Sequence, residues 1–362
     1  MNRHRVTRFA GAAIAGAALA FTTAATAQEP LKIGFVYVSP IGDAGWTYQH
    51  DLARKEMEKA LGAKVQTKYV ENVPEGADAE RVIRELAAGG SKLILTTSFG
   101  YMNPTIKVAP QFPNVMFDHA TGYKTAKNVG VYNARFYEGR YLCGIIAGKM
   151  TKTNVAGYVA AFPIPEVVQG INAFTQGMRS VNPNAEVKVI WVNSWFDPGR
   201  EREAANTLMS QGADVVTHHT DSTAVVQAAE EKGKYSFAYH SDMSKYGPKT
   251  QLTATTHQWG AFYTKTANDA IAGKWKPENI WGGIKDGMIR LAPLNPAVPK
   301  DVADMVAKAQ KDIVDGKLHP FQGPLKDNTG KERVPAGKAM TDDEMQKMDF
   351  YVAGVQGSLP KK

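Results

Sequence analysis

The sequence predicts an α/β protein made of two doubly wound parallel-sheet lobes. Short runs rich in β-branched and apolar residues recur from Leu31 onward. Amphipathic stretches of helical period separate these runs, and the same alternation begins again near Asn154. Apolar strands that alternate with amphipathic helices are typical of parallel sheets covered on both faces. The repeated alternation therefore predicts two such sheets, each forming the centre of one lobe.

The first lobe is predicted from five strands and the helices between them. The strand segments, in chain order, are LKIGFVYV, KVQTKYV, KLILTT, NVMFDH and NVGVYNA. The clearest helical segments are GWTYQHDLARKEMEKAL and ADAERVIRELAAGG. Glycines near the ends of these helices, in ALGA and AAGG, agree with C-terminal caps. This part of the chain therefore predicts a series of βαβ units.

The second lobe repeats this order of elements without repeating the residues. Its strand segments are NVAGYVAAF, EVKVIWVN, ADVVTHH and KYSFAYH. Its helical segments are PEVVQGINAFTQGMRSV, DPGREREAANTLMSQG and DSTAVVQAAEEKG. Near the C-terminus, DNTGKERVPAGK is rich in turn residues and indicates an irregular hairpin.

Short crossings are expected to join the lobes, because no Gly/Ser-rich or Pro-rich tether separates them. The candidate crossings are residues 131–134, 253–257 and 280–285. A mature chain of about 335 residues suits two domains of similar size. The predicted bounds are a signal peptide at 1–27, an N-terminal lobe at 28–133 and 257–282, and a C-terminal lobe at 134–256 and 283–362.

The N-terminus has the three parts of a secretory signal peptide. A basic stretch, MNRHRVTRF, precedes the short apolar run AGAAIAGAALAF and the small-residue motif ATA before Gln28. A retained anchor is the alternative, but the apolar run is short and rich in alanine for a membrane-spanning helix. No cysteine stands at the predicted cleavage point, so the sequence predicts an exported protein without a lipid anchor.

The charge pattern argues against a nucleic-acid-binding protein, and the cysteine content argues against thiol chemistry. Without the three arginines of residues 1–27, 40 basic residues stand against 35 acidic ones, a net charge of +5. These charges are interspersed and form no basic block among aromatics, so nucleic-acid binding is not expected. The single cysteine, Cys143, lies in an apolar helical pattern, which favours a packing role over chemistry.

The segments that follow the strands are the expected ligand site, since ligands of open parallel sheets bind outside the carboxyl ends of strands. These segments are rich in aromatic residues and aspartates. Two facing lobes with such segments suit a flat molecule with polar edges, because rings stack on its faces and carboxylates accept from its N–H groups. The residues are Trp46, Phe99, Tyr101, Phe162, Trp195, Phe196, Asp43, Asp118, Asp197, Asp221 and Asp242.

Each of these features also has a simpler interpretation. Trp46 could pack at a helix start, and Asp43 and Asp197 could cap helices. His218 and His219 suggest a metal site, but adjacent strand residues face opposite sides, so no metal or cofactor is expected. The strand-end serines have no nucleophile-elbow context, so the sequence predicts no catalytic residue and no enzyme.

Five long segments carry a resemblance to a known family: KIGFVYVSPIGDAGWTYQHDLARKEME, TTSFGYMNPTIKVAPQFPNVMFDHATGY, YNARFYEGRYLCGIIAG, PEVVQGINAFTQGMRSVNP and WVNSWFDPGREREAANTLMSQGADVVTHHTDST. The mature chain resembles the basic membrane protein (BMP) family, the substrate-binding proteins of ABC importers. It is similar to the purine nucleoside receptor A type, and closest to a branch associated with adenine. The resemblance implies the type I periplasmic binding protein fold, with two lobes joined by three hinge crossings.

The resemblance also implies which residues bind the ligand. Trp46 replaces the family's stacking phenylalanine on the first lobe. Phe196 is its expected counterpart on the second, with the adjacent Trp195 as the alternative residue that faces the ligand. Asp43 and Asp118 are expected to bind the base edge. The remaining expected ligand-binding residues are Phe99, Gly100 and Tyr101 after the third strand, Asp221 and Asp242 on the second lobe, and Trp259 near the second crossing.

Two departures from the family pattern predict a free base rather than a nucleoside. The family's D-x-x-F-N stretch is Asp43-Ala44-Gly45-Trp46-Thr47 here, so its asparagine is lost. Nucleoside binders have a lysine near the second hinge, where this chain has His257 and Trp259. The large ring of Trp259 is expected to occupy the space of a sugar. Adenine is therefore expected to bind better than adenosine, and better than guanine if Asp118 faces its amino group.

The predicted function is that of a monomeric, non-catalytic receptor in the periplasm. It binds a purine base between its lobes, closes by hinge motion and delivers the ligand to an ABC permease in the inner membrane. The alternatives are a purine nucleoside-binding receptor of the same family, a ligand sensor that signals to a membrane receptor, and a periplasmic enzyme on a similar scaffold.

Overall fold

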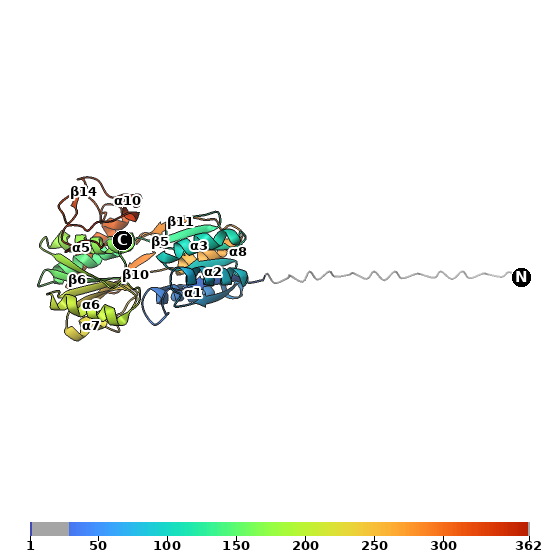
Figure 1. The fold of residues 1–362 in the computed structure, drawn as a ribbon, viewed down its shortest axis with the longest axis horizontal. Helices are drawn as coiled ribbons and strands as arrows, with labels where there is room; N and C mark the ends of the chain where they lie inside the picture. The colour runs from blue at the N-terminus through green and yellow to red at the C-terminus, as the bar shows by residue number, and fades with distance from the viewer. Residues whose placement is uncertain (2–28, 361–362) are drawn as a thin grey trace.

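The computed structural model describes Met1 and residues 29–360. Apart from Met1, the predicted signal peptide lies outside the described residues. Figure 1 shows two lobes side by side, each with a central sheet between layers of helices. The two six-stranded sheets are almost entirely parallel, and the predicted α/β class with two doubly wound lobes is confirmed.

The first sheet contains the five predicted strands and one strand from later in the chain. Its order is β11-β5-β4-β3-β1-β2, and every neighbouring pair is parallel. Consecutive residues such as Phe35 and Val36 are both fully buried, because helices cover both faces of the sheet. The strands are β1 (Leu31–Val36), β2 (Val65–Val70), β3 (Leu93–Thr96), β4 (Met116–Ala120), β5 (Val129–Ala134) and β11 (Asn279–Gly282).

Four helices cover the first sheet, two on each face. Apolar residues of α1 and α8 form one core cluster with the sheet, and those of α2 and α3 form another on the opposite face. Helix α8 therefore belongs with the first sheet although it follows the second sheet's strands in the chain. The helices are α1 (Trp46–Leu61), α2 (Ala77–Ala88), α3 (Met102–Val108) and α8 (Gly260–Ile271).

The second sheet has the corresponding order, β12-β10-β9-β8-β6-β7. Its pairs are parallel except for the short edge strand β12, which runs antiparallel to β10. The four predicted strands of this lobe are confirmed. The strands are β6 (Val155–Ala160), β7 (Glu186–Trp191), β8 (Val215–His219), β9 (Tyr235–His240), β10 (Gln251–His257) and β12 (Ile289–Leu291).

Five helices cover the second sheet, α4, α5 and α9 on one face and α6 and α7 on the other. Helices α4 and α5 touch through glycines: a Cβ on Gly144 would lie 2.1 Å from the Phe174 carbonyl oxygen. Only residues without a side chain allow this approach. The helices are α4 (Phe136–Met150), α5 (Pro165–Val181), α6 (Pro198–Ser210), α7 (Ala224–Lys232) and α9 (Lys300–Val314).

The C-terminal segment packs onto the α4–α5 face of the second lobe. It contains the predicted hairpin, β13 (Leu325–Lys326) and β14 (Glu332–Val334), and the short helix α10 (Asp342–Gln346). The buried Asn172 side chain of α5 fastens this segment, because it donates to the Phe350 carbonyl oxygen (2.8 Å) and accepts from the Val352 N–H (3.0 Å).

Three short segments connect the sheets, as predicted. They join β5 to α4, β10 to α8, and β11 to β12, and β5 and β10 lie near the waist in Figure 1. Arg135 holds two of them together, since its backbone N–H donates to the Gly282 carbonyl oxygen (2.7 Å). Its guanidinium also forms an ion pair with Asp342 of α10 (2.7 Å). The crossings are thus bound to one another and to the C-terminal segment.

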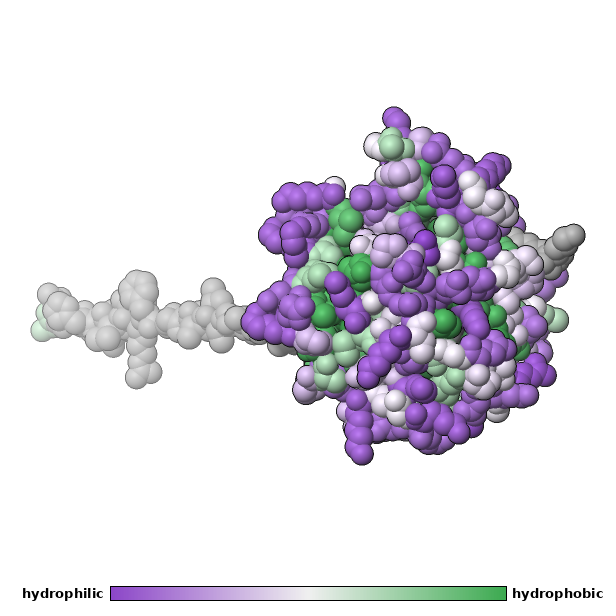
Figure 2. All heavy atoms as spheres, turned by 90° about the vertical axis from the view of Figure 1, so that its left-hand side faces the viewer, coloured by the Kyte–Doolittle hydropathy of each residue, from purple (hydrophilic) through white to green (hydrophobic). Residues whose placement is uncertain are grey.

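The second lobe presents a largely hydrophilic outer face in Figure 2. Among the described helices, none combines the length and the apolar character that crossing a bilayer requires. Cys143 is buried in α4, as its apolar context indicated, and its Sγ lies 3.4 Å from the Thr255 hydroxyl.

Candidate ligand-binding site

A cavity lies between the carboxyl ends of the two sheets, with a wall from each lobe. It contains about 310 Å³ of space not filled by atoms, part of which is open to the surrounding solvent. The first lobe contributes Val38, Trp46, Ser98, Phe99 and Thr121 to its lining, and the second contributes Ile164, Glu166, Trp195, His219, Asp221 and His240. Three predicted site residues, Trp46, Phe99 and Asp221, are among them.

Trp46 is the first residue of α1 and is placed by the glycine before it. Gly45 has a φ of 97°, a backbone conformation that glycine adopts readily and other residues rarely do. Its N–H donates to the Ser241 hydroxyl (2.8 Å), and a Cβ there would lie 2.1 Å from the Asp221 carbonyl oxygen. The Trp46 indole N–H donates to the Thr97 carbonyl oxygen (2.6 Å). The Gly-rich turn therefore lets the lobes meet and fixes the ring at their junction.

The Trp46 side chain is both cavity wall and core. Only 6% of it is exposed, and its ring centroid lies 4.9 Å from that of His257 and 5.3 Å from that of His240. Burial lowers the pKa of His257 to about 3 and that of His240 well below its usual value. These imidazoles are therefore neutral and pack against the Trp46 ring, His240 as part of the cavity wall and His257 behind it.

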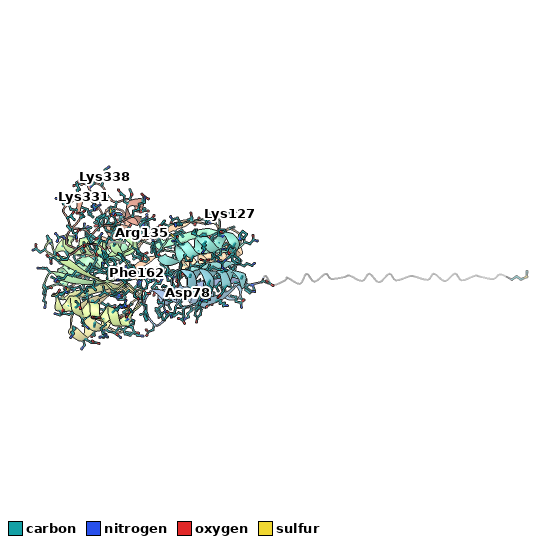
Figure 3. The ribbon with its side chains drawn as sticks, viewed as in Figure 1. Asp78, Lys127, Arg135, Phe162, Lys331 and Lys338 are labelled. Carbon is teal, nitrogen blue, oxygen red and sulfur yellow. The ribbon has the colours of Figure 1, made fainter. Side chains whose placement is uncertain are left out.

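Trp195, rather than Phe196, faces the cavity from the second lobe. Its indole N–H donates to the Glu75 carboxylate of the first lobe (3.1 Å), and its ring lies 5.0 Å from that of Phe162. In Figure 3, Phe162 lies on the side of the second lobe that faces the first. Phe196 is 41% exposed. The next residue, Asp197, caps α6 by accepting from the Arg200 N–H (3.0 Å), as its simpler interpretation proposed.

Asp221 joins the two lobes at the cavity. Its carboxyl accepts from the Ser39 hydroxyl of the first lobe (3.0 Å). A buried carboxylate in α6 holds the loop on both sides of Asp221, because Glu201 accepts from the hydroxyls of Thr220 (2.8 Å) and Ser222 (2.5 Å). Burial raises the pKa of Asp221 well above its usual value, with smaller contributions from nearby Glu201 and Glu75. A neutral carboxyl here both donates and accepts hydrogen bonds.

Glu166 and His219 form a second polar pair in the wall. Glu166 lies in the first turn of α5, after the loop that follows β6, and His219 ends β8. The Glu166 Oε1 lies 3.5 Å from His219 Nε2. Burial raises the pKa of Glu166 to about 8 and lowers that of His219 well below its usual value. Within the described residues, no three His, Cys, Asp or Glu side chains gather in a way that suits a metal ion.

The two aspartates predicted to bind the base edge do not line this cavity. Asp43 is exposed and accepts from Lys245 Nζ (2.6 Å) and the Tyr246 hydroxyl, so it connects the lobes at the surface. Asp118 lies within β4, on the sheet face that α8 covers, and accepts from the Trp275 indole N–H (2.9 Å) in a separate small cavity of the first lobe. Its position in the strand, before the carboxyl end, directs it away from the interlobe space.

The other predicted site residues support the cavity from outside its lining. Tyr101 is buried and donates to the Val73 carbonyl oxygen (2.6 Å). The Gly100 N–H donates to Glu75 (3.0 Å). Asp242 accepts from Gln251 (2.7 Å) in the second lobe. Trp259 is 1% exposed and its ring is stacked on that of His50, so it lies in the core and not in the cavity wall.

Two ionisable lining residues, Glu166 and His219, were not selected as ligand-binding residues by the sequence reasoning, although their segments were. Glu166 ends FPIPE, which follows β6, and His219 is the last residue of β8. The sequence reasoning expected aspartates to bind the base edge and therefore did not select Glu166. It considered His219 only as a possible metal ligand. A complete list of strand-end polar residues would have included both.

Comparisons with known proteins agree with this architecture. The sequence model of one family, described as ABC transporter substrate-binding protein PnrA-like (Bmp), matches residues 31–318. A purine-binding protein of Brucella abortus (strain 2308) is 55% identical over 93% of this chain and 96% of its own. A putative ABC transporter glucose-binding protein of Haloferax volcanii is 40% identical over 92% of this chain and 82% of its own.

Solved structures share the fold at low sequence identity. A solute-binding protein of an ABC transporter system from Aeropyrum pernix K1 superposes with a TM-score of 0.71 at 19% identity, over 84% of this chain and 95% of its own. A transcriptional activator of the comK gene from Bacillus halodurans gives 0.67 at 24% identity, over 80% and 100%. The family match over most of the chain decides its class: this protein belongs to the Bmp family of PnrA-like ABC transporter substrate-binding proteins.

Proposed function

We propose that this protein binds a purine base, with adenine favoured, in the cavity between its lobes and delivers it to an ABC permease in the inner membrane. The observation that carries the proposal is the composition of the cavity. Aromatic rings stand on both walls, Trp46 and Phe99 on one and Trp195 on the other, with carboxyl and imidazole groups between them. Rings bind the faces of a flat base, and the polar groups bind its edge.

The name of a close relative supports the same ligand class. The Brucella abortus relative, 55% identical over nearly the full length of both chains, is named a purine-binding protein. Family members are binding proteins, which supports a receptor that leaves its ligand chemically unchanged. We therefore expect purified protein to return adenine intact after prolonged incubation, as measured by chromatography.

The polar groups of the sugar support a base over a nucleoside. A ribose would add three hydroxyl groups that a closed site must satisfy, and each buried, unpaired polar group costs about 1–3 kcal/mol. Trp259 lies behind Trp46, so the preference for a base rests on this cost and not on that ring.

The contacts between the lobes support a receptor that must open to exchange its ligand. Ser39 with Asp221, Gly45 with Ser241, and Trp195 with Glu75 are hydrogen-bonded across the cavity. Hinge motion at the three crossings breaks these contacts while each sheet stays intact. We expect scattering in solution to show a monomer that becomes more compact when ligand is added.

Export to the periplasm completes the proposal. ABC substrate-binding proteins act outside the cytoplasm, and the N-terminus has the composition of a cleavable signal peptide without a cysteine at its end. N-terminal sequencing of protein from the periplasmic fraction is expected to begin at Gln28.

Two measurements test the ligand. Mass spectrometry of small molecules released from the native protein is expected to find adenine. Calorimetric titration of ligand-stripped protein is expected to give tighter binding of adenine than of adenosine, and adenosine binding tenfold tighter would favour the nucleoside receptor. Glucose belongs in the same series, because the Haloferax volcanii relative is named a putative glucose-binding protein. Binding of glucose without any purine would contradict the proposal.

A further inference from the structure

Glu166 has an oxygen in the cavity wall that no protein group satisfies. The side chain is 12% exposed and lines the interlobe cavity. Its Oε1 lies 3.5 Å from His219 Nε2, whereas its buried Oε2 has no hydrogen-bond partner. Buried polar atoms are almost always paired in folded proteins. A ligand in the cavity is therefore the expected partner of Oε2.

His219 lies beside Glu166 with one ring nitrogen toward the carboxyl. Its Nε2 lies 3.5 Å from Glu166 Oε1. Its other nitrogen, Nδ1, is buried and has no hydrogen-bond partner among the described residues. When Nε2 carries the proton, its N–H is directed toward the Glu166 carboxyl and orients it.

Arg140 does not neutralise Glu166. Its guanidinium donates to the Thr217 hydroxyl (3.0 Å) and the His218 carbonyl oxygen (2.5 Å), and its charge lies 3.5 Å from the centroid of the Tyr239 ring. An ionised Glu166 would leave a charged oxygen buried without a partner, which is costly. A protonated Glu166 instead offers an accepting Oε1 beside a donating Oε2–H.

We propose that Glu166, oriented by His219, binds the ligand as a neutral carboxylic acid that pairs with a donor N–H and the adjacent acceptor on one edge of a purine. This inference rests on the proposed function and adds the group that binds the base edge. Gln pairs with adenine in the same two-bond manner in DNA recognition. His219 is a positioning residue, since it acts on the ligand through Glu166.

Other charged and titratable groups face this site from every side. Asp221 and His240 line the same cavity, and Glu75 reaches it through Trp195. Tyr158 and Tyr239 lie behind His219 with Arg140. The N-terminus of α5 favours the ionised form of Glu166, but burial outweighs it and raises the pKa to about 8. Asp221 is thus the other carboxyl that could give binding a pH dependence.

The test is a calorimetric titration of adenine into the ligand-stripped protein at pH 7, 8 and 9. We expect the wild-type dissociation constant to rise about tenfold from pH 7 to pH 9, because a proton must then be taken up on binding. Glu166→Gln is expected to bind within about threefold of wild type at pH 7 and to show no such rise. Asp118→Asn is the matched control, a buried carboxyl with a pKa raised to about 7 in a different cavity. It should keep the wild-type profile.

A second measurement needs no variant. Titration of the wild type at pH 8.5 in two buffers of different ionisation enthalpy is expected to show uptake of between a half and one proton for each adenine bound.

Four outcomes would overturn the inference while the proposed function stands. The first is a loss of more than tenfold in the adenine affinity of Glu166→Gln at pH 7, and the second is that the wild type takes up no proton when adenine binds. The third is a pH dependence of binding that persists in Glu166→Gln and thus belongs to Asp221. The fourth is a pH dependence that only Asp118→Asn removes. Failure of the wild type to bind any purine at any pH would instead contradict the proposed function itself.

Discussion

The two walls of the cavity come from sheets of the same topology, yet they differ in chemistry. The first-lobe wall, with Trp46 and Phe99 at its centre, contains no ionisable side chain among its lining residues in the described part of the chain. The second-lobe wall contains four: Glu166, His219, Asp221 and His240. Both walls thus contain aromatic rings, whereas all the ionisable lining groups come from the second lobe.

This division has a physical consequence for binding. Ring contacts tolerate any flat molecule, whereas hydrogen bonds to buried carboxyl groups distinguish one edge from another. Changes in the first-lobe wall should therefore lower affinity for all purines alike. Changes in the second-lobe wall should alter the choice among purines and the dependence of binding on pH.

The largest effect is expected from the two tryptophans. Trp46→Ala should lower the free energy of unfolding by about 3–5 kcal/mol, because the side chain is almost fully buried, and should abolish measurable adenine binding. The half-buried Trp195 is the contrast. Trp195→Ala should leave the melting temperature close to wild type and weaken binding by roughly 1–3 kcal/mol. Thermal melts measure the stability of each variant, and calorimetry measures its adenine affinity. Equal losses of stability in the two variants would contradict the expectation that Trp46 is part of the core and Trp195 is not.

A smaller loss of stability is expected at Glu201, which supports the second-lobe wall without lining it. Glu201→Ala leaves the hydroxyls of Thr220 and Ser222 without their buried acceptor, so unfolding should become easier by about 2–4 kcal/mol. Binding should weaken as well, since these residues flank Asp221. Glu203→Ala, an exposed carboxylate on the same helix, is the control and should change neither quantity.

The ionisation of Glu166 should also appear in the stability of the ligand-free protein. Because folding raises the pKa of Glu166, wild-type stability falls as the pH rises from the usual glutamate value toward about 8. Glu166→Gln lacks this loss and should be more stable than wild type by about 4–5 kcal/mol at pH 9. The two proteins should be equally stable at pH 4. Denaturant unfolding at both pH values tests this prediction. If the stability difference between the two proteins is the same at both pH values, it does not come from ionisation of Glu166.

The smallest effect is expected at the surface contact between the lobes. Lys245 and Asp43 are both mostly exposed, so their ion pair contributes little to the closed form. Lys245→Ala should weaken ligand binding by less than about fivefold at low salt and not at all at high salt. Lys249→Ala removes a nearby positive charge outside this contact and should have no effect. A large loss that salt does not reduce would make this contact part of the site.

Much of the architecture could be predicted from the sequence because it depends on local patterns. Apolar strands and amphipathic helices alternate in a way that only covered parallel sheets satisfy, so nine strands were recognised before any contact was known. The rule that ligands lie beyond the carboxyl ends of strands then brought Trp46, Phe99 and Asp221 to the cavity. Family resemblance added the likeness to purine receptors, which the comparisons support.

The details of the site depended on the tertiary structure, because they arise where distant segments meet. Whether Trp195 or its neighbour faces the cavity is decided by Glu75, which lies 120 residues away in the chain. Asp118 is turned away by the pleat of its own strand and the helix packed over it. Burial raises the pKa of Glu166, and only the packed lobes create that burial. Sequence patterns thus determined the elements and their order, and the packing of the two lobes against each other decided which side chains line the cavity.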